Sequence, residues 1–359
     1  MHPIKSSLHL RHLPLPVFTG QSEIVKKQLL GAICFSQADI GNLQFISSPS
    51  SSFAQGDGDK WTAGLPILQV TTTVDDAFCE VFIGGNHPSS GEKGNISYRH
   101  DGDMLFGVFK LPQTANAAQA ASLQSTTESA YQQIFTLLDE LQYPFTYRFW
   151  NYMSDINGIS QGLERYRQFN LGRQEAYRAC GREVKSELPA ACALGLAQGT
   201  LSIAFMAGRT LALAIENPRQ ISAYEYPEEY GPRSPTFARG CLLPEQGILF
   251  ISGTASIVGH QTLHAGDVIA QTRETLVNMQ AVIDEANSRL NSTGFDSKNI
   301  FYRVYMRNSS IKSLIKKELQ RALGSDIKAM FVRADICRHD LLLEIEATAC
   351  LTSEITDQP

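Results

Sequence analysis

Two glutamates near the end of the chain, Glu344 and Glu346, stand inside an apolar run from Leu341 to Ala349 (LLLEIEATA). Apolar surroundings disfavour the ionised form of a carboxyl group and raise its pKa, so that a proton is available near pH 7. Residues two apart on a strand face the same side, so the pattern alone does not choose between the two. The run predicts one buried acid, and a solvated strand position is the alternative for the other glutamate.

An arginine upstream of this run is a candidate for binding an anion. A hairpin centred on Arg338-His339 would bring Arg333 roughly opposite Glu344. The planar guanidinium group binds a carboxylate through two parallel hydrogen bonds. Arg333 is therefore a candidate for binding an anion, and a surface salt bridge to Asp335 or Glu346 is the alternative.

The same hairpin would place Cys337 on the surface that carries Arg333 and Glu344. A lone cysteine on a strand is typical of a small buried hydrophobe. Only Arg338 and His339 beside it would favour the thiolate. The residues alone therefore favour a Cys337 that packs rather than one that attacks.

Further groups could complete an anion-binding site, and for each arginine a structural salt bridge or cap is an equal alternative. Arg148 lies among aromatic residues in Tyr147 to Tyr152 (YRFWNY), which suits a half-buried position facing a neighbouring unit. A glycine at position 253 would let backbone amides approach a carboxylate closely. The other candidates are Tyr230, Arg233, Arg239, Gly253 and Tyr305.

The elements that must position these residues occur twice in the same order. In each half a strand is followed by a helix, a second strand and a second helix, and one or two further strands close the series. The first series is 104–111, 125–141, 146–153, 163–178 and 199–207, and the second is 247–253, 265–290, 300–306, 310–323, 327–336 and 341–349. The pairs Tyr147-Arg148 and Tyr302-Arg303 hold the same place in the two halves. Ser202 stands about where the second half has Glu344, so we expect the first half to lack the acid.

This order predicts an α+β protein of two tandem units, each with a mixed sheet covered by helices. We expect an N-terminal domain at 1–216, a linker rich in Pro, Tyr and Glu at 217–234, and a C-terminal domain at 235–359.

Composition excludes several classes of function. The 359 residues carry a net charge of -5 with acidic and basic residues interspersed, which gives no footprint for nucleic acid or an anionic membrane. No segment approaches the ~20 apolar residues of a membrane span, and the first eighteen residues lack a signal-peptide core. Seven scattered cysteines without a metal-ligand spacing favour a reducing compartment, hence the cytoplasm, and no structural zinc. Cofactor-binding motifs are absent too, so we expect no cofactor.

The second half resembles the YjgF/RidA family of reactive-intermediate deaminases, whose fold is chorismate mutase-like. The residues that carry the resemblance are Ile251-Ser-Gly-Thr254, Asp267, Gln271-Thr-Arg273, Asn278, Arg333 and Leu343 to Ala347. Two copies in one chain, together with residues 147–152 and 230–239 (YGPRSPTFAR), resemble a narrower group within that superfamily, the chorismatases. This second resemblance extends over nearly the whole chain.

The chorismatase resemblance implies cleavage of chorismate to pyruvate and either a cyclohexadiene diol or a hydroxybenzoate. It implies that Glu344 protonates the enol methylene of the substrate and that Arg333 holds a carboxylate. A cysteine seven residues before the glutamate resembles the group that makes 3-hydroxybenzoate, so Cys337 is expected to be a product-controlling wall. An output that includes 4-hydroxybenzoate is compatible with this resemblance, and a smaller residue at that position goes with the diol.

Two other functions remain as alternatives at this point. Arg333 and Glu344 also match an imine or enamine deaminase, although such proteins usually resemble one copy. A metabolite-binding protein without turnover is the other alternative. Family members assemble as trimers, because a single sheet leaves one face that needs a partner. Two fused copies could cover part of these faces within one chain, so the resemblance leaves a monomer or a homotrimer.

Overall fold

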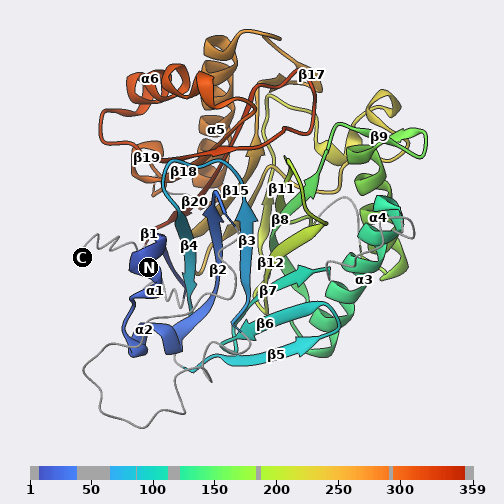
Figure 1. The fold of residues 1–359 in the computed structure, drawn as a ribbon, viewed down its shortest axis with the longest axis vertical. Coiled ribbons are helices and arrows are strands. Elements are labelled where there is room, and N and C mark those ends of the chain that lie inside the picture. The colour runs from blue at the N-terminus through green and yellow to red at the C-terminus, as the bar shows by residue number, and fades with distance from the viewer. Residues whose placement is uncertain are drawn as a thin grey trace.

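The computed structural model describes residues 8–38, 65–85, 87–111, 122–182, 187–290 and 294–351. In the described residues, three sheets of four or six strands with covering helices follow one another along the chain, and two further sheets have two strands each (Figure 1). We call the three larger ones the N-terminal unit (residues 9–83), the middle unit (89–208) and the C-terminal unit (213–350).

The N-terminal unit has a four-stranded sheet in the order β1-β4-β2-β3. Strand β2 runs parallel to β3, and β4 is antiparallel to β1 and β2. The elements are β1 (His9–Pro14), α1 (Leu15–Thr19), α2 (Glu23–Gln28), β2 (Leu29–Ser36), β3 (Ile67–Thr71) and β4 (Phe78–Ile83).

The middle unit has a six-stranded sheet in the order β11-β8-β12-β7-β6-β5. Its elements are β5 (Ser89–Lys93), β6 (Ile96–His100), β7 (Met104–Lys110), α3 (Leu123–Glu140), β8 (Phe145–Ser154), β9 (Ile159–Ser160), β10 (Leu163–Glu164), α4 (Arg165–Ala179), β11 (Ala190–Leu196) and β12 (Ser202–Gly208). The N-cap of α3 is Ser122, whose side chain accepts from Ser125 N, so the helix begins two residues before the predicted start at 125.

The C-terminal unit has a six-stranded sheet in the order β13-β14-β15-β20-β18-β19. Its elements are β13 (Leu213–Ile215), η2 (Ala223–Glu225), η3 (Glu228–Tyr230), β14 (Gly240–Leu243), β15 (Ile248–Thr254), β16 (Ile257–Val258), β17 (Gln261–Thr262), α5 (Val268–Leu290), η4 (Ser297–Asn299), β18 (Phe301–Met306), η5 (Ser309–Ile311), α6 (Lys312–Leu323), β19 (Lys328–Arg333) and β20 (Leu343–Cys350). The segment 217–234, expected as a linker, contains η2 and η3.

The three units share one strand order, which is β1-β4-β2-β3, β7-β12-β8-β11 and β15-β20-β18-β19 in turn. Counted along the chain, the second and third strands of each unit run parallel to each other: β2 and β3, β8 and β11, β18 and β19. The fourth strand, β4, β12 or β20, lies between the first and the second and is antiparallel to both. The α+β class and the tandem repetition are confirmed. The N-terminal unit adds a third, shorter copy, where the sequence predicted two.

The register corrects two expectations. Strand β18 lies between β19 and β20, so Arg333 pairs with Met306, and the predicted hairpin that sets Arg333 opposite Glu344 is wrong. Glu344 pairs with Tyr305, two residues after Arg303. Its counterpart in the middle unit is therefore the partner of Trp150, two residues after Arg148, which is Ala204 rather than Ser202. The middle unit still lacks the acid.

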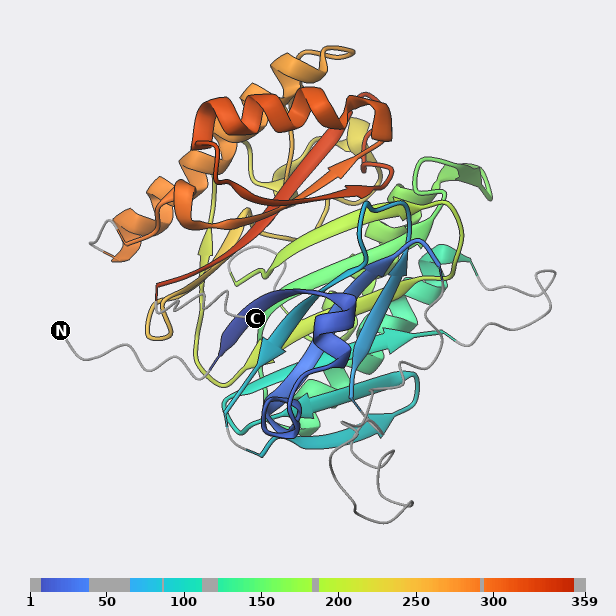
Figure 2. The ribbon, with the colours of Figure 1, turned by 60° about the vertical axis from the view of Figure 1, so that its left-hand side comes forward.

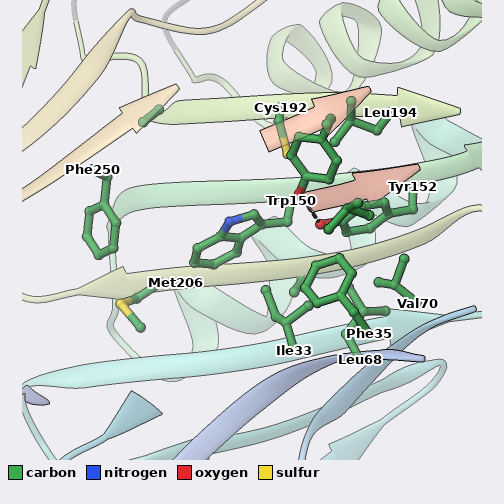
Figure 3. Packing of buried hydrophobic residues seen from close by; sticks show 14 of the residues in the cluster. Ile33, Phe35, Leu68, Val70, Trp150, Tyr152, Cys192, Leu194, Met206 and Phe250 are labelled. Carbon is green, nitrogen blue, oxygen red and sulfur yellow. Dashed lines mark hydrogen bonds between the residues drawn. The ribbon is translucent and has the colours of Figure 1, made fainter. Parts of the chain in front are cut away.

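One buried core joins the three sheets. Side chains from β2 and β3, from β8, β11 and β12, and from β14 and β15 pack together in it, among them Phe35, Trp150, Met206 and Phe250 (Figure 3). The opposite face of each sheet packs on its own helices through separate clusters, and Figure 2 shows α5 and α6 on the outer side of the C-terminal sheet. The inner faces of the three sheets are thus covered within one chain.

A disulfide joins Cys34 and Cys79, which face each other on β2 and β4. The expectation of a reducing compartment did not include this bridge; Cys180, Cys192, Cys241, Cys337 and Cys350 are free thiols. None of the helices in the described segments is long and apolar enough to cross a membrane.

Candidate active site

A cavity of about 590 Å³ opens where the middle and C-terminal units meet. The start of α4 forms one wall, the segment 217–239 covers another, and β15, β20 and the loop 337–340 form the rest. Within the described residues, no group of three or more His, Cys, Asp or Glu side chains could hold a metal ion.

Glu344 lies on β20 at the inner end of this cavity and is 4 % exposed. Burial, and then the negative charge of Glu346, raise the pKa of the Glu344 carboxyl to about 8, against smaller opposite effects of Arg148, Arg239 and Arg307. In the described part of the chain no ion pair neutralises it. Glu344 is therefore a protonated acid at neutral pH.

Gly253 makes room for this carboxyl group. A Cβ atom at position 253 would lie 1.9 Å from Glu344 Oε1. The pairing of β15 with β20 is irregular between Ile251 and Thr254. A residue without a side chain is required here because the backbone passes directly beside the acid.

Cys337 is the nearest side chain with chemical reactivity. Its Sγ lies 4.0 Å from Glu344 Oε2. Burial, together with the neighbouring Glu344, raises the pKa of the Cys337 thiol to about 12. The thiol is therefore neutral and a poor nucleophile.

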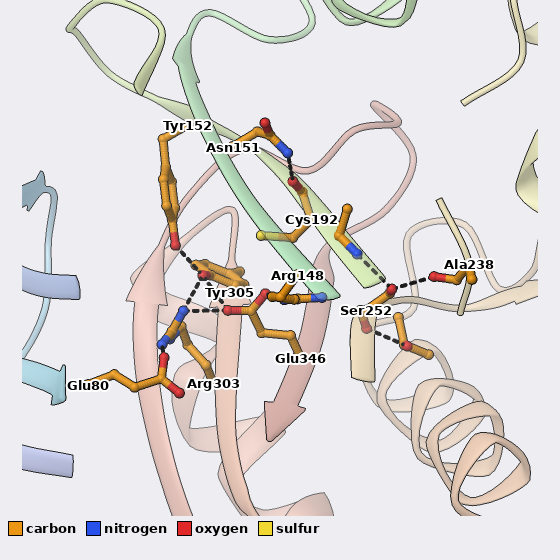
Figure 4. A network of polar contacts seen from close by, with 12 residues as sticks. Glu80, Arg148, Asn151, Tyr152, Cys192, Ala238, Ser252, Arg303, Tyr305 and Glu346 are labelled. Atoms are coloured by element: carbon orange, nitrogen blue, oxygen red, sulfur yellow. Dashed lines mark hydrogen bonds and ion pairs between the residues drawn. The ribbon is translucent and has the colours of Figure 1, made fainter. Parts of the chain in front are cut away.

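Glu346 does not reach the cavity. Arg148 and Arg303 both bind its carboxylate, and the Tyr305 hydroxyl donates to it at 2.9 Å. Arg303 also binds Glu80 of the N-terminal unit, so the network links side chains of all three units (Figure 4). The solvated position that the sequence allowed for one of the two glutamates is wrong, because Glu346 is 3 % exposed and both are buried. Of the two, Glu344 lines the main cavity.

Arg148 and Tyr305, two of the expected ligand-binding residues, belong to this network. Arg148 is 1 % exposed and Tyr305 is fully buried, and neither lines the main cavity. The Tyr305 hydroxyl also meets the Tyr152 hydroxyl at 2.7 Å. The flanking aromatic residues predicted a half-buried Arg148 that faces a neighbouring unit. Arg148 does face the C-terminal unit, but it is fully buried there and pairs with Glu346.

Two arginines line the cavity with unused hydrogen-bond donors. Arg239 is 5 % exposed and donates through Nη2 to Tyr226 Oη at 2.8 Å and to Ile221 O at 3.0 Å. Arg338 donates to His260 O at 2.7 Å and stacks on Tyr230, 4.0 Å from the ring centroid. Arg239 Nε and Arg338 Nη2 are buried without a partner.

Two other predicted arginines lie away from the cavity. Arg333 contacts Asp335 at 3.4 Å with 30 % of its side chain exposed, which is the salt bridge given as the alternative. Arg233 pairs with Glu175 at 3.3 Å on the surface. Of the nine predicted site residues, the structure brings Glu344, Cys337, Arg239, Tyr230 and Gly253 to the main cavity.

Sequence reasoning missed Arg338, Tyr226 and Tyr166, which line the cavity with them. Tyr226 and Arg338 carry a weak signal, because Arg338 directly follows the candidate Cys337 and Tyr226 lies in an aromatic-rich stretch. Treating 217–234 as a linker hid that signal.

Comparison with known proteins places the chain in a family. Residues 80–207 match the family model described as "Chorismatase FkbO/Hyg5-like, N-terminal". A "3-hydroxybenzoate synthase" of Streptomyces hygroscopicus is 36 % identical over 79 % of this chain and 85 % of its own length. The chain belongs to the chorismatase family.

Further relatives of this chorismatase agree with that assignment. A "Chorismatase" of Streptomyces rapamycinicus is 35 % identical over 78 % of this chain and 84 % of its own length. A crystal structure titled as a chorismatase superposes with a TM-score of 0.80 at 32 % identity, covering 96 % of this chain and 99 % of that one. The fold is thus shared over nearly the full length.

Proposed function

We propose that this chorismatase cleaves the enolpyruvyl ether of chorismate and releases pyruvate and 3-hydroxybenzoate. The observation that carries the proposal is Glu344, a carboxyl group buried at the end of the cavity with its pKa raised to about 8. A relative that is 36 % identical bears the name 3-hydroxybenzoate synthase, which supports the same product.

Glu344 starts the reaction by giving its proton to the methylene carbon of the enol. The ether carbon becomes an oxocarbenium ion, and the ring 4-hydroxyl adds to it and loses its proton. The C4–O bond then breaks, so pyruvate leaves with the former 4-hydroxyl oxygen while the ether oxygen stays on C3. Loss of the C3 proton makes the ring aromatic, and of the two protons released one goes to the C3 oxygen and one restores the acid. Chorismate contains all atoms of pyruvate and 3-hydroxybenzoate together, so this reaction consumes no net water, whereas the diol product requires one.

Chorismate carries two carboxylates, and the cavity offers cations for at least one. Arg239 Nε and Arg338 Nη2 are buried donors without a protein partner. We assign the ring carboxylate to these two arginines, because charge-assisted hydrogen bonds to a desolvated carboxylate are strong. Tyr226 and Tyr230 pack against the guanidinium group of Arg338 and orient it.

The wall formed by Cys337 supports 3-hydroxybenzoate over the diol. Its sulfur lies 4.0 Å from Glu344 and occupies space beside the reacting methylene. A water molecule there would capture the oxocarbenium ion and give the diol.

The test is a cofactor-free incubation of the purified protein with chorismate. Pyruvate is followed by a coupled enzyme assay and the ring product by chromatography against 3-hydroxybenzoate, 4-hydroxybenzoate and diol standards. We expect pyruvate and 3-hydroxybenzoate in equal amounts. Absence of pyruvate would contradict the proposal, and imine hydrolysis would be assayed next.

Three further assignments accompany this function. We propose a monomer, because the sheet faces meet in one core within the chain. We propose the cytoplasm, where the Cys34–Cys79 bridge would be reduced to thiols like the other five cysteines, and a small molecule rather than nucleic acid as partner, in line with the net charge of -5. Sedimentation, cell fractionation and nucleic-acid gel shifts test them.

A further inference from the structure

The segment between β19 and β20, residues 334–342, carries two groups of the cavity wall, Cys337 and Arg338. We call it the Cys337 loop. Its Asp335 forms a single bridge with Gly195 of β11, and residues 336–342 are turns and irregular backbone. Without a strand ladder, the carbonyl groups of this loop depend on other donors to fix their position.

Arg307, the residue after β18, binds the Cys337 loop through its side chain. Its Nε donates to Leu341 O at 2.6 Å, and its Nη2 donates to Ile336 O at 2.8 Å and to Arg338 O at 2.7 Å. Its Nη1 contacts Asp335 Oδ1 at 3.3 Å. One guanidinium group thus holds the backbone on both sides of the cysteine.

The shape of the guanidinium group matters for this arrangement. Arginine presents five N–H donors in a rigid plane, whereas lysine has a single ammonium nitrogen. The three carbonyl oxygens are bound from two different nitrogens of Arg307, Nε and Nη2, so one ammonium nitrogen cannot take the place of both. Only 17 % of the Arg307 side chain is exposed, and hydrogen bonds from a charged donor that is largely removed from water are strong.

The Cys337 loop sets the distance between the sulfur and the acid. Cys337 Sγ lies 4.0 Å from Glu344 Oε2. The carbonyl groups of the residues on either side of the cysteine, Ile336 and Arg338, both bind Arg307 Nη2. The position of the sulfur therefore follows the position of the guanidinium group, although Arg307 itself does not line the main cavity.

We propose that Arg307 is a positioning residue that fixes Cys337 beside the acid and thereby keeps water away from the oxocarbenium ion. The inference rests on the proposed function, in which the wall formed by Cys337 favours 3-hydroxybenzoate over the diol. When the guanidinium fork is removed, the loop loses its fixed position, the sulfur leaves the space beside the reacting methylene, and water enters. The ratio of the two ring products is then the property that Arg307 controls.

The test compares the ring products of Arg307→Lys with those of the wild type. Lysine keeps the positive charge that acts on Glu344 and loses the two-nitrogen fork, so an altered product ratio reports position rather than charge. We expect the ratio of diol to 3-hydroxybenzoate to rise at least about threefold, because displacement of a group by an ångström changes rates by up to about 100-fold. A ratio does not depend on the amount of folded enzyme, so a purely structural role of Arg307 would leave it unchanged.

A double substitution shows whether Arg307 acts through the cysteine. Arg307→Lys is combined with Cys337→Ala, which by itself opens the space for water. We expect the double variant and Cys337→Ala alone to give the same product ratio, because the two substitutions remove the same wall. A further shift toward the diol in the double variant would overturn the role assigned to Arg307.

Arg182→Lys is the matched control. Arg182 has 16 % of its side chain exposed, donates to Pro144 O at 2.9 Å and pairs with Asp139 at 2.6 Å, outside the lining of the main cavity. We expect Arg182→Lys to keep the wild-type product ratio. Thermal melts are recorded for every variant, and a variant of low stability is assayed at reduced temperature, where its folded fraction gives the ratio. If Arg307→Lys does not fold, Arg307→Gln is measured with the same expectation.

Benzoate binding separates this inference from the proposed function. Benzoate stands for the substrate ring with its carboxylate, and its dissociation constant is measured by NMR titration without turnover. Because Arg307 also binds Arg338 O, we expect Arg307→Lys to weaken benzoate binding at least about threefold, and Arg182→Lys to leave it unchanged.

An unchanged product ratio in the folded Arg307 variant would overturn the positioning role while the proposed function stands. A wild type that releases no pyruvate from chorismate, beside an Arg307→Lys variant that still binds benzoate more weakly, would refute the proposed function and leave Arg307 as the residue that positions the loop.

Discussion

Burial sets the protonation state of Glu344, and this gives the activity a defined pH dependence. Only the protonated carboxyl can transfer a proton to the substrate, and its pKa is raised to about 8. We expect kcat/KM to hold up to near pH 8 and then to fall tenfold per pH unit. A pH–rate profile measures this, and an activity that rises between pH 7 and pH 9 would contradict the role of Glu344 as the acid.

The sulfur of Cys337 is expected to decide which ring product forms. Cys337→Ala removes the sulfur that lies 4.0 Å from Glu344 and opens space for water. We expect the diol to replace a large share of the 3-hydroxybenzoate while pyruvate release continues. Chromatography of the ring products checks this, with Cys180→Ala, at a free thiol outside the cavity lining, as the matched control. An unchanged product ratio would remove Cys337 from this role.

The sequence predicted the acid but misplaced its partners. A glutamate in an apolar run is an unusual local pattern, so the neighbours alone narrowed the acid to Glu344 or Glu346, and the family resemblance favoured Glu344. The local sequence does not tell whether Arg333 or Arg338 faces the cavity. That depends on the position of β18 between β19 and β20. Insertion of a strand that is distant in sequence leaves no mark on local patterning.

At the scale of elements, the irregular pairing of β15 with β20 holds Gly253 against the acid. Gly253→Ala would bring a methyl group to within 1.9 Å of Glu344 Oε1 unless the carboxyl moves. Misplacement by an ångström reduces catalysis about 100-fold, so we expect a drop in kcat of that order.

Benzoate binding and thermal melting distinguish this effect from misfolding. Gly85→Ala is the matched control, because its new methyl group would meet Asp101 no closer than 3.6 Å. Full activity of Gly253→Ala would show that the acid tolerates displacement and would contradict the geometry described for it.

Strand β11 shows where periodicity failed as a predictor. Its sequence, Ala190 to Leu196, is AACALGL, which is poor in β-branched and aromatic residues. Every residue is buried because the strand lies between the middle and C-terminal sheets. A strand covered on both faces shows no alternation, so the sequence predicts no strand between the helix at 163–178 and the strand at 199–207.

For the whole molecule, the network of Glu80, Arg148, Arg303 and Glu346 ties the three units together. Arg303→Met would leave two buried carboxylates with one cation fewer. Removal of one partner from a buried ion pair costs about 3–5 kcal/mol. We expect the free energy of unfolding in urea to fall by that amount.

An exposed pair serves as the comparison for Arg303. Arg289 and Glu285 are one turn apart on the surface of α5, so Arg289→Met should change the unfolding free energy by less than about 1 kcal/mol. Equal effects of the two substitutions would mean that the network does not hold the units together.

The repetition itself was partly visible in the sequence. The middle and C-terminal units keep both long helices, so their order of elements could be recognised twice. The N-terminal unit has only α1 and α2, of five and six residues, between its first two strands. Short helices give little periodicity, so this copy emerged only from its strand order.

The central claim is that Glu344 is the acid that cleaves chorismate. Its most direct test is pyruvate release by the wild type and by Glu344→Gln under identical conditions, with benzoate binding measured for both. We predict stoichiometric pyruvate from the wild type and a loss of at least about 100-fold in the variant, with benzoate binding retained. Pyruvate release by Glu344→Gln at the wild-type rate would contradict the account.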